Sequence, residues 1–255
     1  MKVAILQSDL IWENPQANRK HFEQQIKAIQ EEVDLIVLPE MFSTGFTMHP
    51  FEVAETMQGE TVAWMKQMAQ LKKSAVTGSV IITENENFYN RMVFVFPDGA
   101  IQSYDKRHLF SLAKEEAVFT PGKEKVIVDY NGWEICLQIC YDLRFPVFAR
   151  NVENYDVLLY VASWPKPRIN AWDTLLQARA IENMCYVVGV NRIGSDANAY
   201  EYIGHSQAVD FLGNYLAAPF EDENVKIITL DKNLMLETRQ KLNFLEDRDT
   251  FEIFK

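Results

Sequence analysis

The sequence predicts a layered α/β domain with mixed rather than wholly parallel sheets. Apolar runs of strand length alternate with amphipathic helical patterns through both halves of the 255 residues. Hairpin signals recur between the apolar runs, and hairpins join antiparallel strands. No linker, internal repeat or low-complexity segment interrupts this alternation, so we expect a single domain over residues 1–255.

The first half of the chain alternates two helical segments with strands. A helix is expected over residues 14–32, where Asn14 is a candidate cap and Pro15 suits the first turn. A second helix is expected over residues 60–74, which carry an apolar stripe. Residues 97–100 favour a turn, because proline presets φ and glycine permits a positive φ. The strands expected in this half cover residues 3–9, 34–39, 75–83, 89–96 and 101–105.

The second half repeats this alternation. Residues 125–140 predict a hairpin that turns at Asn131 and Gly132, the strongest short hairpin signal. Helices are expected over residues 146–154, 171–184 and 234–242. The further strands expected here cover residues 156–163, 186–192, 205–211, 215–220 and 225–230. Three aromatic side chains of the tail need a partner surface, such as a second subunit: Phe244, Phe251 and Phe254.

Composition and charge argue against several classes of function. The formal net charge is −11 and no basic stripe offsets it, so nucleic-acid binding is not expected. No run of about 18 apolar residues is present, and the segment after Met1 turns polar too soon for a signal peptide. Three cysteines, an odd number, suit a reducing compartment. We therefore expect a cytoplasmic protein without membrane partners.

Two of the cysteines, Cys136 and Cys140, lie four positions apart on one expected strand. They share a face, but their Cα atoms lie roughly 13 Å apart at about 3.3 Å per residue. A disulfide needs less than about 7 Å, so the two are not bonded to each other. Cys136 is central and suits a small buried apolar role, as does Cys185 at a helix end. Cys140 lies at a strand-to-helix turn, where backbone N–H groups favour a thiolate.

Reactive side chains follow three expected strands. Glu40 follows residues 34–39, Lys106 follows residues 101–105, and Cys140 follows an apolar run. Ligands collect at such strand ends in open α/β sheets, so a carboxylate, an ammonium and a thiol can meet in one crevice. The alternative is that Glu40 and Lys106 merely end strands and face water. The four histidines have no metal-ligand spacing, so a metal site is not expected.

These segments resemble the carbon–nitrogen hydrolase, or nitrilase, superfamily. The similar motifs are "LIVLPEMFSTGF" around Glu40, "SYDKRHLF" around Lys106 and "CYDLRFPVFAR" around Cys140, in family order. The resemblance implies a four-layer αββα sandwich that pairs as a homodimer into an eight-layer assembly. It also implies that Cys140 is the nucleophile and that neither a metal nor an organic cofactor takes part. A second glutamate is expected at Glu115 on spacing, with Glu116 as the alternative.

The resemblance implies hydrolysis of an amide through a thioester. Glu40 acts as the base, while Lys106 and the backbone N–H of Tyr141 hold the oxyanion. Two arginines near the motifs, Arg144 and Arg168, suit a substrate carboxylate, unless they pair with surface acids. The candidate walls of the substrate site, any of which can instead be core, are Phe42, Phe46, Phe110, Phe145 and Trp164.

Within the superfamily the motifs look similar to the ω-amidase branch. Such enzymes hydrolyse 2-oxoglutaramate and 2-oxosuccinamate to 2-oxo acids and ammonia. An N-carbamoyl amine hydrolase or a deaminated-glutathione amidase would use the same set of reactive groups with a different pocket. A function of another class is a non-catalytic redox sensor on this fold, with Cys140 as its thiol. The presence of all three reactive types favours an enzyme.

Overall fold

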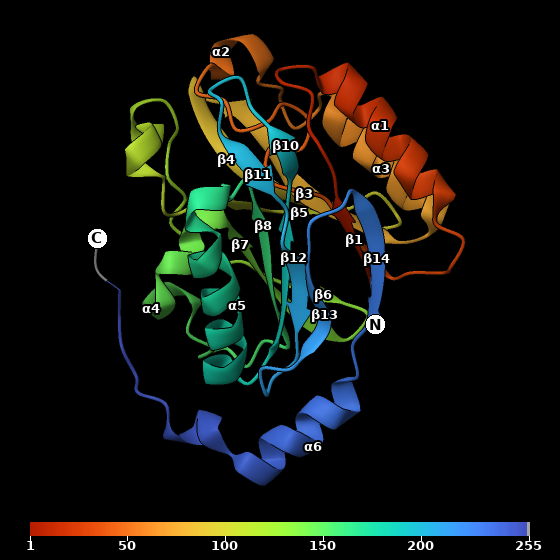
Figure 1. Ribbon diagram of the computed structural model, residues 1–255. Helices are drawn as coiled ribbons and strands as arrows, with labels where there is room; N and C mark the ends of the chain where they lie inside the picture. The colour runs from red at the N-terminus through yellow and green to blue at the C-terminus, as the bar shows by residue number, and fades with distance from the viewer. Residues whose placement is uncertain (254–255) are drawn as a thin grey trace.

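The computed structural model describes residues 1–253 and contains two six-stranded sheets that pack face to face (Figure 1). In the first sheet, β1, β2 and β3 are parallel, and the other strands join them in antiparallel pairs. Its strands, in spatial order, are β14 (Asn224–Thr229), β1 (Lys2–Gln7), β2 (Leu35–Val37), β3 (Ala75–Glu84), β4 (Asn87–Val95) and β5 (Ile101–Asp105).

The second sheet has the same mixed character. Strands β7, β8 and β9 are parallel, and the strands outside them are antiparallel. Its strands, in spatial order, are β13 (Tyr215–Phe220), β12 (Ser206–Val209), β9 (Tyr186–Asn191), β8 (Val157–Ala162), β7 (Trp133–Ile139) and β6 (Ile127–Tyr130). A separate small hairpin is formed by β10 (Ile193–Ser195) and β11 (Glu201–Ile203).

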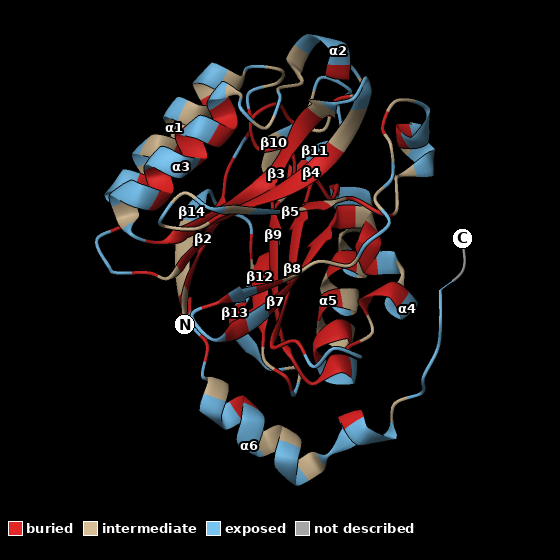
Figure 2. Ribbon diagram, turned by 180° about the vertical axis from the view of Figure 1, so that it is seen from behind, coloured by how far each residue is buried: buried red, intermediate tan, exposed pale blue. Residues whose placement is uncertain are grey.

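Helices cover the outer face of each sheet. The first sheet carries α1 (Pro15–Ala28) and α3 (Glu60–Lys72), and the second carries α4 (Pro146–Ala149) and α5 (Ile169–Asn183). The buried residues, red in Figure 2, follow both sheets and the sides of these helices that face them. This arrangement confirms the predicted four-layer αββα sandwich. Two further helices are α2 (Pro50–Val53) and α6 (Lys232–Leu242).

Strand alternation divides the core into its layers. In β1, Val3 and Ile5 belong to the large apolar cluster that the two sheets share. The intervening residues, Ala4 and Leu6, belong to the cluster beneath α1 and α3. Side chains on a strand point to opposite faces in turn, so one apolar strand supplies two cores. This explains why the central strands read as continuous apolar runs.

Local sequence signals account for several element boundaries. Asn14 caps α1, because its side chain accepts a hydrogen bond from the N–H of Ala17 at 3.1 Å. Asn131 and Gly132 both have positive φ, 52° and 74°, as a two-residue type I′ hairpin turn requires. The expected helix 146–154 ends early, at Ala149. Beyond it, the side chain of Asn151 hydrogen-bonds the backbone of Tyr155 in both directions and so replaces helical pairing.

Some elements of the structure have no counterpart among the predicted ones. The sequence patterns did not predict the β10–β11 hairpin or α2. Within residues 1–253, every helix is too short or too polar to cross a bilayer. Of the tail aromatics, Phe244 and Phe251 are exposed, and Phe254 lies outside the described residues.

Candidate active site

The end of β2 carries Glu40 into the space between the sheets. After β2 the chain continues through Pro39 and turns sharply, and Met41 has a left-handed φ of 45°. The N–H of Met41 donates to Oγ of Ser79 on β3 at 2.8 Å, which holds this turn in place. Glu40 is completely buried, so the alternative that its side chain faces water is wrong.

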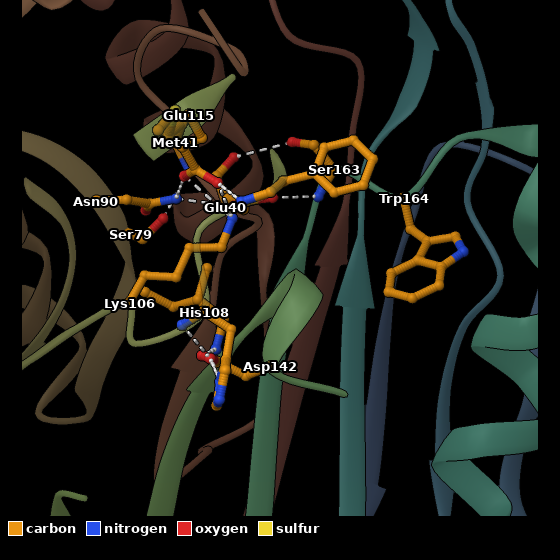
Figure 3. A network of polar contacts seen from close by, with 12 residues as sticks. Glu40, Met41, Ser79, Asn90, Lys106, His108, Glu115, Asp142, Ser163 and Trp164 are labelled. Carbon is orange, nitrogen blue, oxygen red and sulfur yellow. Dashed lines mark hydrogen bonds and ion pairs between the residues drawn. The ribbon is translucent and has the colours of Figure 1, made fainter. Parts of the chain in front are cut away.

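Lys106 follows β5 and lies between two carboxylates (Figure 3). Its Nζ is 2.9 Å from Oε1 of Glu40 and 2.9 Å from Oε2 of Glu115. Glu115 is buried in a 3-10 helix (Glu115–Ala117), while Glu116 is exposed. The structure therefore places Glu115, and not Glu116, beside the lysine. The N–H of Phe110 holds Glu115 from the other side, at 2.6 Å from Oε2.

Two further groups hold Glu40, and the sequence patterns did not single out either. Nδ2 of Asn90, on β4, donates to Oε1 of Glu40 at 2.8 Å and to Oε1 of Glu115 at 3.3 Å. The backbone N–H of Ser163, directly after β8, donates to Oε2 of Glu40 at 2.8 Å. Because Ser163 follows a strand of the second sheet and Glu40 follows a strand of the first, this bond links the two sheets at the site.

Cys140 is the first residue after β7 and begins a 3-10 helix (Cys140–Arg144). Its φ is 44°, in the left-handed region that residues other than glycine rarely adopt. Its exposed fraction is 9%, and it lines a cavity. Cys136 and Cys185 are fully buried in the core, as expected, and all three cysteines are free thiols.

Burial and neighbouring charges set the protonation states in this site. Burial opposes the charge of Lys106, but the carboxylates of Glu115 and Glu40 outweigh it and raise the pKa of the ammonium. Burial and the charge of Glu40 raise the pKa of Glu115, although Lys106 opposes them. Burial, followed by the charge of Glu40, raises the pKa of the Cys140 thiol well above its ordinary value. These shifts favour a charged Lys106 and a neutral Cys140 thiol, and a neutral thiol needs a base to become a nucleophile.

The cavity above Cys140 has a volume of about 610 Å³. Six residues expected at the site line it: Phe46, Phe110, Tyr141, Arg144, Trp164 and Arg168. Residues of the β10–β11 hairpin and its loop also line the cavity, as do further residues of the first 50. The lining residues that the sequence patterns did not indicate include Trp12, His49, Asp196, Asn198, Tyr200 and Tyr202.

Two aromatic residues expected as cavity walls lie elsewhere. Phe42 is completely buried in the core beneath α1 and α3, and its ring packs edge-on against Phe22 with centroids 5.6 Å apart. Phe145 stacks on His108 with centroids 3.7 Å apart. Neither residue lines the cavity.

The two arginines of the cavity rest on aromatic rings. The guanidinium carbon of Arg144 lies 4.9 Å from the ring centre of Trp164, and that of Arg168 lies 5.1 Å from Phe110. Within residues 1–253, neither guanidinium pairs with a carboxylate, although the chain has 36 acidic residues. By contrast, nearby Lys166 pairs with Glu201 at 2.9 Å. The arginines therefore keep their hydrogen-bond donors available to a ligand in the cavity.

An αββα sandwich with a thiol beside a buried carboxylate–ammonium pair has the composition of a thiol-dependent hydrolase. The carbon–nitrogen hydrolase family model matches residues 2–240, and the chain belongs to this family. The chain is 43% identical to omega-amidase YafV of Yersinia enterocolitica, over 98% of each chain. It is 33% identical to the 2-oxoglutaramate amidase of Bacillus subtilis, over 96% of each chain.

A solved structure gives a similar result. A carbon–nitrogen hydrolase superfamily protein of Xanthomonas campestris, determined with an arsenic adduct in its active site, superposes with a TM-score of 0.97. It is 40% identical, and the match covers 100% of this chain and 99% of the other. The predicted resemblance is therefore confirmed: the protein is an amidase of the carbon–nitrogen hydrolase family and resembles the ω-amidase branch.

Proposed function

We propose that this amidase hydrolyses the terminal amide of small 2-oxo dicarboxylic acid monoamides, such as 2-oxoglutaramate and 2-oxosuccinamate. The observation that carries the proposal is the pair of arginines without acidic partners, Arg144 and Arg168, in the cavity that contains Cys140. Two fixed cations suit the carboxylate end of such a substrate, and its amide then reaches the thiol. The similarity to an omega-amidase and a 2-oxoglutaramate amidase agrees with this substrate class.

The first half of the proposed reaction forms a thioester. Glu40 takes the proton of the Cys140 thiol, and the sulfur bonds to the amide carbon. The resulting oxyanion is held by the Lys106 ammonium and the N–H of Tyr141, which lies in the first turn of a helix and has no carbonyl partner there. Glu40 then gives its proton to the amide nitrogen, the C–N bond breaks, and ammonia leaves.

The second half of the reaction hydrolyses the thioester. Water gives a proton to Glu40 as its oxygen bonds to the acyl carbon, and Glu115 helps to position this water through Lys106 and Asn90. The C–S bond breaks, the sulfur recovers the proton from Glu40, and the 2-oxo acid leaves. Neutral Cys140 is restored, in keeping with the raised pKa of its thiol.

Ammonia release across a panel of amides tests this proposal. The panel contains 2-oxoglutaramate, 2-oxosuccinamate, glutamine, N-carbamoylputrescine and deaminated glutathione. We expect the highest kcat/KM for the two 2-oxo monoamides. A clear preference for the carbamoyl amine or for deaminated glutathione would overturn the substrate assignment. Labelling of Cys140 by iodoacetamide without ammonia release from any amide would instead favour a redox sensor.

Replacing Arg144 by glutamine tests the carboxylate contact. Loss of one hydrogen bond between charged groups costs about 1.5–3 kcal/mol, so we expect KM for 2-oxoglutaramate to rise roughly 10- to 100-fold. The kcat value should change much less, because Arg144 binds the far end of the substrate. Initial rates at varied substrate concentration measure both constants.

The matched control for this test is Lys166→Gln. Lys166 carries the same charge near the cavity, but it pairs with Glu201 and is not among the lining residues. We expect this variant to keep the KM of the wild type. Equal KM values for the Arg144→Gln variant and the wild type would remove Arg144 from the substrate site.

A further inference from the structure

We propose that Asp142 is a positioning residue that fixes Cys140 relative to Lys106 across the interface of the two sheets. This inference rests on the proposed function, since it concerns the same thiol. The observation behind it is that the buried carboxylate of Asp142 accepts hydrogen bonds from the segment before Cys140 and from the segment around Lys106. Figure 3 shows Asp142 beside His108.

Asp142 is completely buried and accepts four hydrogen bonds. Its Oδ2 accepts from the N–H of Ile139 at 2.9 Å and from the hydroxyl of Tyr104 at 2.7 Å. Its Oδ1 accepts from the N–H of His108 at 3.0 Å and from Nδ1 of the same residue at 2.7 Å. Each carboxylate oxygen thus accepts two hydrogen bonds, and a carboxylate has about four acceptor sites in all.

The donors lie next to the reactive residues. Ile139 immediately precedes Cys140 at the end of β7, while Tyr104 and His108 lie two residues before and two residues after Lys106. Because β7 belongs to the second sheet and β5 to the first, Asp142 bonds both sheets within two residues of the thiol and the ammonium. Any relative shift of these segments must lengthen at least one of its four hydrogen bonds.

The backbone of Cys140 needs such support. A residue other than glycine with left-handed φ costs about 1–3 kcal/mol and persists only when its surroundings hold it. The 3-10 turn is held from its far side as well, since Nη2 of Arg179 donates to the carbonyl of Leu143 at 2.6 Å. Asp142 supplies the support on the near side, between Cys140 and the lysine segment.

An amide cannot replace this carboxylate. With asparagine at position 142, the NH₂ group occupies the place of one oxygen and faces two donors. The hydroxyl of Tyr104 and the ring of His108 can change roles, but the N–H of Ile139 and the N–H of His108 cannot. Either orientation therefore leaves one backbone N–H against an NH₂ group, and the segment that carries it must move.

The test compares Asp142→Asn with Asp156→Asn. Asp156 is a buried aspartate at the opposite end of β8 from Ser163, and it accepts from the N–H of Glu134 at 3.0 Å and from Nζ of Lys232 at 2.6 Å. Both variants should lower the thermal unfolding midpoint. A misplacement of about 1 Å costs roughly 100-fold in rate, so we expect Asp142→Asn to lower kcat about 100-fold with KM within about threefold of the wild type. Asp156→Asn should keep the kcat of the wild type.

A second measurement, alkylation of the thiol, needs no amide substrate. The rate constant for alkylation of Cys140 by iodoacetamide should fall at least about tenfold in Asp142→Asn and stay unchanged in Asp156→Asn. If kcat and alkylation in Asp142→Asn match those of Asp156→Asn at equal unfolding midpoints, Asp142 is only structural and the inference fails. If Cys140→Ala still turns over amides, the proposed function itself fails, so the two failures are distinguishable.

Discussion

Replacement of Cys140 by alanine is expected to abolish ammonia release from 2-oxoglutaramate. Without the sulfur no thioester forms, and loss of the nucleophile in covalent catalysis costs on the order of 10⁴-fold or more in kcat. The protein should stay folded, because alanine removes only the sulfur of a side chain that is 9% exposed and lines the cavity. The measurement is ammonia release at saturating substrate, with the unfolding midpoint recorded on the same preparation.

Cys136→Ala is the matched control for this variant. Cys136 is a fully buried thiol of the same strand segment, and burial raises the pKa of its thiol to about 12, so it contributes no thiolate. Its replacement should lower stability slightly and leave kcat intact. If the Cys140→Ala variant keeps its turnover and the Cys136→Ala variant loses it, Cys136 is the nucleophile and the mechanism is refuted.

Replacement of Glu40 by glutamine should remove the proton carrier while keeping the shape of the side chain. General acid–base catalysis contributes about 10²- to 10⁴-fold, and Glu40 acts in both halves of the proposed reaction, so kcat should fall by about that range. The charge of Glu40 helps to raise the pKa of the Cys140 thiol, so its removal lowers that pKa while Lys106 remains beside the sulfur. Alkylation of Cys140 should therefore begin at lower pH than in the wild type, although amide turnover is lost.

The pH dependence of alkylation separates this outcome from simple damage to the site. Ammonia release and iodoacetamide labelling are measured from pH 5 to 10 on the variant, the wild type and Glu116→Gln. Glu116 is exposed and should give wild-type curves in both assays. A Glu40→Gln enzyme with a near-normal pH–rate profile would show that another group transfers the proton.

The sequence predicted the candidate site best where its residues directly follow strands. Glu40, Lys106 and Cys140 each directly follow a segment that the sequence predicts as a strand. That pattern is local and survives without knowledge of the fold. The choice of Glu115 over Glu116 came from the spacing of a family motif, and the structure places Glu115 beside the lysine.

Other parts of the site depend on pairings that no local pattern records. Asn90 lies within β4 and reaches Glu40, which follows β2, only because β3 pairs with β2 on one side and with β4 on the other. Ser163 contributes a backbone N–H, which every residue other than proline possesses. The strands of the β10–β11 hairpin have three residues each, too few to show a period. Phe42 was misplaced because the direction of its ring depends on the turn after Glu40.

The hydrogen bond from the N–H of Ser163 to Glu40 has a consequence for how this protein tolerates change. Glu40 follows a strand of the first sheet and Cys140 a strand of the second, so the distance between them depends on the thickness of the apolar core between the sheets. A larger side chain in that core would keep the hydrogen bonds between strands and would still increase the distance between the Glu40 carboxylate and the Cys140 sulfur. In the proposed reaction, activity is therefore expected to fall when the core between the sheets becomes thicker, while the secondary structure stays intact.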